Sequence, residues 1–223
     1  MTIRFPASLG TDMKRFLLLL LLLSVVLVSC KDEKALASFS MADDGYSCTN
    51  AETGVQYTAM DFCFEPAKTA EEIGAYTDKD ADYTLTYYAI PDLDTALYIA
   101  DSERGVWYAA GAVTPPAAKD LTPTALLVCE EAAVSVEIFR LTAENDGEAL
   151  TELLSLWFEG ERAERPVGAV EFSRRIKVVS AELPNIYYCF DFGTWGDEAY
   201  FYDVFSGRTV AVPATLAERF INT

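Results

Sequence analysis

Histidine is absent from all 223 residues of this chain, and that absence removes much of the catalytic repertoire. Without an imidazole there is no Ser-His-Asp triad, no Cys-His dyad and no H-E-x-x-H zinc site. The sequence also lacks the G-x-S-x-G and S-x-x-K nucleophile motifs, and the Walker A and G-x-G-x-x-G loops that cradle nucleotide phosphates. We therefore assign no catalytic or metal-binding residue and expect no cofactor.

Positive charge is scarce. The chain has 17 lysines and arginines against 35 aspartates and glutamates, a formal net charge of −18. A surface this acidic is repelled by phosphate backbones and by anionic lipid headgroups. The composition therefore excludes nucleic acid as a partner. Cationic partners and divalent cations remain possible ligands. The negative charge can also be explained by its contribution to solubility.

Only one long hydrophobic run is present. It extends over 13 residues, Phe16 to Val28, and follows the cations Lys14 and Arg15. As a helix it would span about 20 Å, whereas a bilayer core is about 30 Å thick. A charged start followed by a short apolar run is typical of a secretory signal peptide, which we predict over residues 1–29. Met13 suits the start of such a peptide.

The end of that run carries a more specific pattern. The residues LVSC, 27–30, resemble the bacterial lipobox, in which two apolar residues and a small one precede an obligatory cysteine. The resemblance implies a bacterial lipoprotein that is cleaved before Cys30, with the Cys30 thiol joined to diacylglycerol. Two or more acyl chains anchor a protein stably in a membrane. The alternative is an ordinary signal peptide with a chance cysteine near its end.

The resemblance implies a location in the bacterial cell envelope. No aspartate follows Cys30 directly, so the common inner-membrane retention signal is missing and the outer membrane is favoured. The residues KDEK, 31–34, are similar to the surface-export tether of lipoproteins in one group of Gram-negative bacteria, and a plain solvated linker explains them equally well. Polar and small residues predict a flexible tether over 30–44.

Four further cysteines follow the proposed anchor: Cys48, Cys63, Cys129 and Cys189. An even number in an exported chain permits two disulfides with three connectivities, of which we prefer Cys48–Cys63 with Cys129–Cys189. Buried free thiols are the alternative, since cysteine packs as a small hydrophobe. The absence of C-x-x-C excludes the thioredoxin-type motif and the usual zinc-ribbon spacing.

The clearest predicted element is a helix over 145–160. Apolar residues recur there at helical spacing from Leu150 to Phe158, and Asn145 or Asp146 suits the N-cap. A stripe of this kind most often packs on a sheet. Thr69–Tyr76 matches a capping box and predicts a shorter helix, and 213–220 predicts a last one.

Most of the remaining chain predicts strands joined by short turns, which must then be antiparallel. The expected strands are 57–64, 84–90, 96–101, 106–112, 134–141, 169–180, 186–192, 200–205 and 209–213. The predicted fold class is α+β, an antiparallel β-rich sheet domain over 45–223 with one main amphipathic helix. The order strand, helix, three strands also occurs twice, over 45–116 and 122–223. Duplication and chance similarity both account for it.

The absence of histidine does not exclude catalysis by carboxylates. The segment 190–203 places four acids among aromatic residues, as glycosidases place their acid pair. These candidates are Asp191, Asp197, Glu198 and Asp203. Strand alternation puts Asp203 on the face of Phe201 and Phe205. The alternative is an aromatic sheet core with the acids facing solvent or bonding turns.

The segment 77–83 begins like a calcium loop, with Asp78, Asp80 and Asp82 at alternate positions. Tyr83 stands where such a loop needs glycine, and Ala89 where it needs a bidentate glutamate. An acidic turn before a strand is therefore the better interpretation.

These patterns favour a lipid-anchored envelope protein that is not an enzyme and acts as a binding or assembly module for a protein or glycan. Two alternatives stay open. One is a carboxylate-dependent glycan hydrolase that uses the acids of 190–203. The other is an acidic inhibitor of a cationic enzyme, which predicts an exposed aromatic patch and salt-dependent binding.

Overall fold

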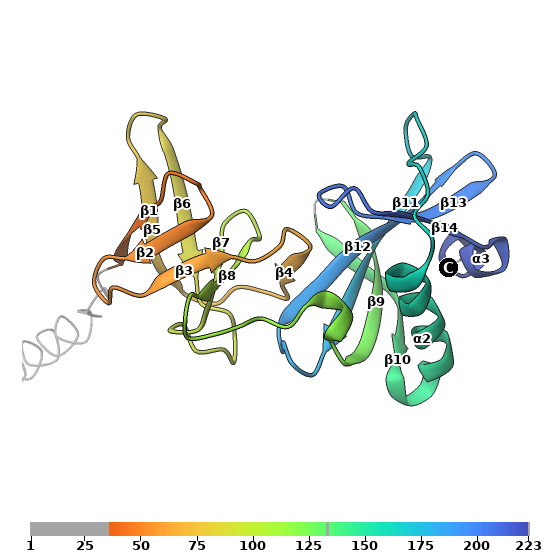
Figure 1. Ribbon diagram of the computed structural model, residues 1–223, viewed down its shortest axis with the longest axis horizontal. Coiled ribbons are helices and arrows are strands. Elements are labelled where there is room, and N and C mark those ends of the chain that lie inside the picture. Colours follow the sequence, from red (N-terminus) through yellow and green to blue (C-terminus); the bar gives the residue numbers. More distant parts are fainter. Residues whose placement is uncertain (1–35, 133, 223) are drawn as a thin grey trace, which may run out of the picture. The chain divides into compact units, whose positions relative to one another are not determined.

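The computed structural model describes residues 36–132 and 134–222 and shows a β-rich chain with two α-helices in that part (Figure 1). The strands are β1 (Ala37–Met41), β2 (Ser47–Asn50), β3 (Gln56–Ala59), β4 (Phe64–Pro66), β5 (Glu72–Asp78), β6 (Tyr83–Tyr88), β7 (Tyr98–Asp101), β8 (Val106–Ala109), β9 (Pro123–Glu131), β10 (Ser135–Thr142), β11 (Phe172–Ser180), β12 (Ile186–Trp195), β13 (Glu198–Tyr202) and β14 (Thr209–Val212). The helices are α2 (Ala143–Glu159) and α3 (Ala214–Ile221), with a 3-10 turn at Ala118–Asp120.

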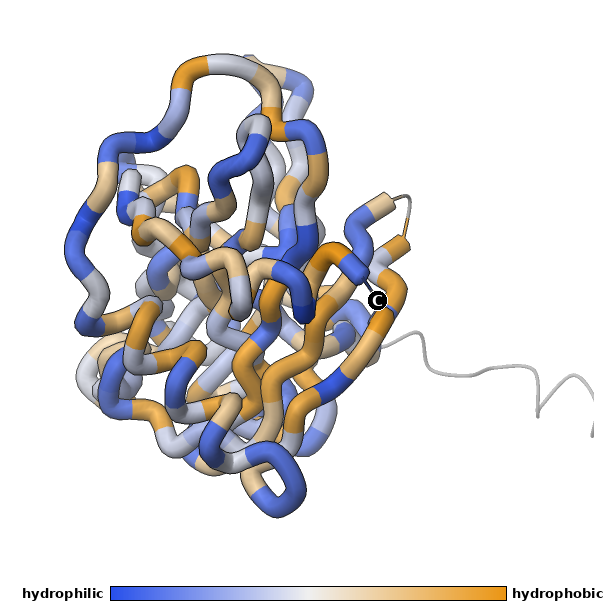
Figure 2. The backbone as a smooth tube through the Cα atoms, turned by 90° about the vertical axis from the view of Figure 1, so that its right-hand side faces the viewer, coloured by the Kyte–Doolittle hydropathy of each residue, from blue (hydrophilic) through white to orange (hydrophobic). Residues whose placement is uncertain are grey.

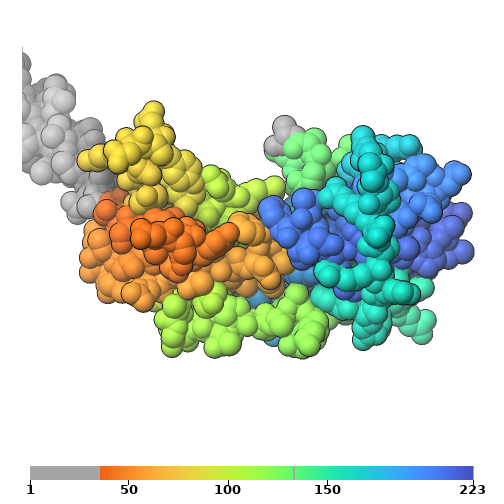
Figure 3. Space-filling view, turned by 45° about the horizontal axis from the view of Figure 1, so that its top comes forward, coloured from red at the N-terminus to blue at the C-terminus, as the bar shows by residue number. Residues whose placement is uncertain are grey.

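Seven strands close into a barrel in the order β1-β2-β3-β8-β7-β6-β5. All neighbours are antiparallel except β1 and β5, whose parallel pairing of Ala37 with Gly74 closes the barrel. Gly74 is required at this contact, because a Cβ there would overlap the Ala37 carbonyl oxygen. The β5–β6 hairpin, yellow in Figure 3, projects from the barrel surface.

Side chains fill the barrel, as is usual for a barrel of this size. Phe39 and Tyr87 lie with ring centroids 4.4 Å apart, and Tyr87 meets Trp107 edge to face at 5.8 Å. The other buried members of this cluster are Ala37, Cys48, Tyr57, Leu85, Ile99 and Ala109. The interior is therefore a packed core for most of its length.

The second sheet is antiparallel, in the order β10-β9-β11-β12-β13-β14. Strand β12 is long enough to pair with β4 over Ile186–Tyr188 and with β13 over Asp191–Trp195. Because β4 belongs to the barrel half of the sequence, this pairing ties the two halves together. Figure 2 shows hydrophobic segments along the strands and hydrophilic segments in many of the loops.

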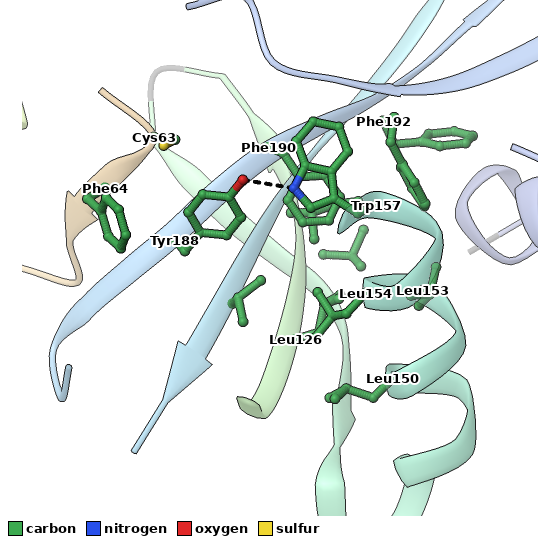
Figure 4. Close-up of a cluster of buried hydrophobic side chains, with 14 of the residues drawn as sticks. Cys63, Phe64, Leu126, Leu150, Leu153, Leu154, Trp157, Tyr188, Phe190 and Phe192 are labelled. Atoms are coloured by element: carbon green, nitrogen blue, oxygen red, sulfur yellow. Dashed lines mark hydrogen bonds between the residues drawn. The ribbon is translucent and has the colours of Figure 1, made fainter. Parts of the chain in front are cut away.

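Helix α2 covers one face of this sheet with the predicted stripe (Figure 4). Leu150, Leu153, Leu154 and Trp157 are buried against core side chains of β9, β11 and β12. The Trp157 ring stacks on Phe190 with centroids 4.5 Å apart. The predicted α+β fold with one main amphipathic helix is confirmed.

Two predictions in the first half of the chain are wrong. The helix over Thr69–Tyr76 is the strand β5, because pairing with β1 and β6 on its two edges outweighs a local capping signal. The tether over 30–44 extends too far, since Ala37–Met41 forms β1. Of the two explanations left open for the halves 45–116 and 122–223, the structure favours chance similarity, because the first half contains no helix and its strand β4 pairs with β12 of the second sheet.

Within 36–132 and 134–222, neither helix combines the length and hydropathy that a bilayer crossing needs.

Candidate functional site at the mouth of the barrel

A cavity of about 600 Å³ lies at one end of the barrel, where the β1–β2 loop, the end of β3, the β5–β6 hairpin and the β7–β8 turn meet. Its buried floor is formed by Met60, Leu85, Val106 and Trp107. Ligand pockets in barrel proteins commonly occupy such a mouth, and this volume is within their usual range. We call this cavity the barrel mouth.

Four exposed aromatic side chains line the barrel mouth, and three of them, each from a different loop, contact one another. Tyr46, Phe62 and Phe205 are 54%, 52% and 65% exposed. Phe62 stacks on Phe205 with centroids 5.0 Å apart and meets Tyr46 edge to face at 6.2 Å. We call these three residues the aromatic rim. Clustered exposed aromatics mark binding surfaces more often than isolated ones do.

Two aspartates hold the rim loops in shape. The Asp44 carboxylate accepts the backbone N–H of Tyr46 at 2.8 Å, which sets the turn before β2. Asp203 accepts the backbone N–H groups of Phe205 and Ser206 at 3.2 and 2.9 Å. Such side-chain-to-backbone bonds stabilise tight turns, so the rim rings are presented by ordered loops.

The β7–β8 turn adds acidic side chains to the lining of the mouth. The buried carboxylate of Asp101 accepts N–H groups from Glu103, Gly105 and the Trp107 indole, each at 2.8 Å, and so fixes the β7–β8 turn. That turn presents Glu103, which accepts the hydroxyl of Tyr83 at 2.9 Å. Partial burial and this hydrogen bond raise the pKa of Tyr83 to about 12.

Asp61 lies beside the rim and is exposed. Among the described residues, no hydrogen bond or ion pair engages its carboxylate. Its carboxylate is therefore available to a cation that enters the mouth.

The two arginines of the mouth are neutralised by other acids. Arg175 Nη1 lies 3.1 Å from both carboxylate oxygens of Asp191, and Arg175 also pairs with Glu65. Arg104 is shared between Glu65 and Glu131 at 3.9 and 3.7 Å. With Lys177, these residues form what we call the ion cluster: Glu65, Arg104, Glu131, Arg175, Lys177 and Asp191.

The charges of the ion cluster balance, with three cations against three anions. Burial raises the pKa of Asp191, although the Arg175 guanidinium opposes that rise. The remaining acids that line the mouth are therefore not compensated by its arginines. They are Asp61, Asp78, Asp101 and Glu103. The barrel mouth is an aromatic pocket with an acidic field.

Three of the four predicted acids of 190–203 each have a hydrogen-bond or ion-pair partner of their own. Asp191 is held by Arg175, and Asp203 bonds its own turn. Glu198 accepts the Tyr200 hydroxyl, and Asp197 is exposed in the β12–β13 turn. Phe205 also does not share the face of Phe201, because β13 ends at Tyr202.

The four described cysteines are free and buried, so the preferred disulfides Cys48–Cys63 and Cys129–Cys189 are absent. Burial raises the pKa of Cys48 to about 11 and that of Cys63 to about 12, and it also raises the pKa of Cys129 and Cys189. Because the thiolate is the reactive form of cysteine, these groups are unsuited to nucleophilic chemistry.

The segment predicted as an acidic turn joins β5 to β6. The Asp78 carboxylate accepts the backbone N–H groups of Asp80 and Ala81 at 2.9 and 3.2 Å. Across 36–132 and 134–222, no three potential metal-ligating side chains gather. Cys30 and the predicted signal peptide lie outside the described residues.

Sequence analysis missed Tyr46, Phe62 and Glu103 as site residues and placed Phe205 in a strand. The available signal was an aromatic residue directly beside turn residues, as in the segments DGYS and VFSG. An aromatic ring in a turn cannot alternate into a sheet core, so it is a candidate for exposure.

Comparison with protein-family models, with curated proteins and with solved structures found no match for this chain.

Proposed function

We propose that this chain is an exported bacterial lipoprotein, anchored at the outer membrane through acylated Cys30, whose barrel mouth binds a ligand. The observation that carries the binding role is the aromatic rim at the entrance of a cavity of about 600 Å³. The anchor rests on the order of signals over 13–30. The missing histidine and the protonated thiols favour binding over catalysis.

Placing three large rings in water has an energetic cost that a merely structural role does not explain. Each ring sits in a loop whose backbone is held by hydrogen bonds, so the rim is preorganised and loses little entropy on binding. Aromatic residues supply a large part of the binding energy at protein interfaces. This arrangement therefore supports a binding module.

The rim is tested with the double variant Phe62→Ser/Phe205→Ser and three probe classes: hexa-arginine amide, hexa-glutamate amide and a chitin hexasaccharide. We expect one class to bind the wild-type chain and its Kd to rise by about tenfold in the variant, since two stacking rings are lost. Isothermal titration calorimetry measures the affinities.

The matched control is Val134→Ser/Val136→Ser, which removes two exposed apolar side chains from the β9–β10 hairpin and lies outside the mouth. It should leave the affinity unchanged. Equal affinities for the rim variant and the wild-type chain would contradict a binding role for the barrel mouth.

The anchor is tested by Cys30→Ala in the native envelope. We expect intact-mass spectrometry of the wild-type chain to show an N-terminus at Cys30 with diacylglycerol and fatty acyl groups, and detergent to be needed for extraction. The variant should lack the lipid mass. An unmodified Cys30 with the signal peptide still attached would refute the proposed location at the outer membrane.

A further inference from the structure

We propose that the barrel mouth receives an arginine or lysine side chain presented by a basic segment of a protein partner. This inference rests on the binding function proposed above and specifies the chemistry of its ligand. It is carried by the combination of uncompensated acids and exposed rings in one cavity.

The acids of the barrel mouth favour a positively charged ligand. Within the mouth, Arg104 and Arg175 are matched by Glu65, Glu131 and Asp191, so the free field comes from the acids around them. The Asp61 carboxylate has no hydrogen bond or ion pair among the described residues, and Glu103 is exposed in the β7–β8 turn. The net charge of −18 extends this field into solvent and speeds the encounter with a cation.

The aromatic rim favours an organic cation over a metal ion. A guanidinium or ammonium is attracted to the face of an aromatic ring, and this attraction adds to that of nearby carboxylates. Phe62 and Phe205 both line the cavity and are more than half exposed, so a ligand in the mouth can contact their rings. A small hydrated metal ion gains little from such rings, whereas an organic cation on an aliphatic stem also covers apolar surface.

The same chemistry already holds parts of this fold together. The Arg165 guanidinium lies 4.8 Å from the centroid of the Tyr202 ring, and Arg208 lies 5.4 Å from that of Trp157. Tyr202 lies in β13 of the second sheet, and Trp157 lies in α2. The barrel mouth offers similar aromatic rings beside acids. Among the described residues, no arginine makes a cation–π contact with a rim residue.

A protein segment fits the cavity better than a neutral glycan or an anion. The mouth holds about 600 Å³, which accommodates a long side chain with part of its flanking backbone. An acidic peptide would meet Asp61 and Glu103 without a free cation in the mouth to receive it. A neutral sugar would gain nothing from the field that these acids create.

The test uses the isosteric double variant Asp61→Asn/Glu103→Gln, in which the new amide oxygen at position 103 can still accept the Tyr83 hydroxyl. With hexa-arginine amide as the probe, we expect the Kd to rise by about fivefold or more, because two charges facing the ligand are lost. Fluorescence anisotropy with a labelled probe measures the affinity. The rim variant should weaken the same probe although its charge is unchanged.

The charge control is Glu148→Gln/Glu152→Gln, which removes two exposed acids from α2, on the helix-covered face of the second sheet. It should leave the Kd within about twofold of the wild-type value, since charges more than a Debye length apart are screened at about 0.15 M salt. A loss equal to that of the mouth variant would show nonspecific attraction and overturn the proposal.

The outcomes separate this inference from the function on which it rests. If the chitin hexasaccharide or hexa-glutamate amide binds in a rim-dependent manner and hexa-arginine amide does not, the barrel mouth is a binding site but the ligand class is wrong. If no probe shows rim dependence, both proposals fail. Rim-dependent binding of hexa-arginine amide that also falls in Asp61→Asn/Glu103→Gln supports both.

Discussion

Replacing Trp157 by alanine should lower the free energy of unfolding by about 3–5 kcal/mol, because it empties a buried aromatic site at the centre of the helix–sheet core. Trp157 is 1% exposed and stacks on Phe190 with an interplanar angle of 4°. Its indole N–H donates to the Tyr188 hydroxyl at 2.8 Å (Figure 4). Urea unfolding followed by circular dichroism measures the loss.

The polar part of this site can be separated from its packing. In Trp157→Phe the ring remains but the Tyr188 hydroxyl loses its donor, and in Tyr188→Phe the buried indole N–H loses its acceptor. Each single variant should lose about 1–3 kcal/mol, since a buried polar group is left unsatisfied. The double variant should lose less than the sum, because neither partner then remains. Strict additivity would contradict the importance of this hydrogen bond.

The sequence predicts α2 well because helical periodicity is local. The stripe from Leu150 to Trp157 needs no knowledge of its partner to identify the buried face. The start of the helix is less well predicted. Thr142 caps it by accepting the Asn145 N–H at 3.2 Å, whereas Asn145 or Asp146 was the expected cap. The preceding strand β10 reaches Thr142, so the helix begins where the strand ends.

The barrel could not be predicted, because its closure depends on contacts between distant residues. The segment from Thr69 carries a capping signal, yet β5 is formed by pairing with β1 and β6. No sequence pattern shows that residues 37–38 lie beside 74–75. The same difficulty made β1 resemble a tether, since five residues with two small polar side chains give a weak strand signal.

The candidate site could not be predicted from the sequence for a related reason. The nearest cation to Glu65 in the sequence is Lys68, but in the fold Glu65 pairs with Arg175, 110 residues away. The rim residues come from three separate loops. Sequence patterns identify which residues lie in turns, but only the closed barrel and the β4–β12 pairing bring those turns to one cavity.

The ion cluster leads to the second large effect. Arg175→Met should lower the free energy of unfolding by about 3–5 kcal/mol, because it leaves buried carboxylates without their main counter-charge. The Arg175 side chain is 15% exposed and those of Glu65 and Asp191 are 12% and 20% exposed, so water reaches them poorly. Methionine keeps much of the aliphatic volume, which limits the contribution of a cavity.

The matched control is the neighbouring Arg174→Met. Arg174 is 11% exposed, but its ion-pair partner Glu130 is 57% exposed and 3.8 Å away. Because Glu130 remains in contact with water, Arg174→Met leaves no buried carboxylate without a counter-charge, so this variant should lose less stability than Arg175→Met. If the two variants lose equal stability, the effect of Arg175 is one of packing and the electrostatic argument fails.

The dependence on pH separates charge from packing more sharply. Burial already raises the pKa of Asp191 in the folded chain, and Arg175 opposes that rise, so its removal should raise this pKa further. A group whose pKa is raised on folding stabilises fully below the unfolded value of about 3.9, and this contribution is lost as the pH rises through the folded value. The deficit of Arg175→Met relative to the wild-type chain should therefore widen as the pH rises from about 4 to neutrality. The other members of the ion cluster are present in both chains, so a deficit that stays constant over this range would show that Asp191 does not depend on the Arg175 charge.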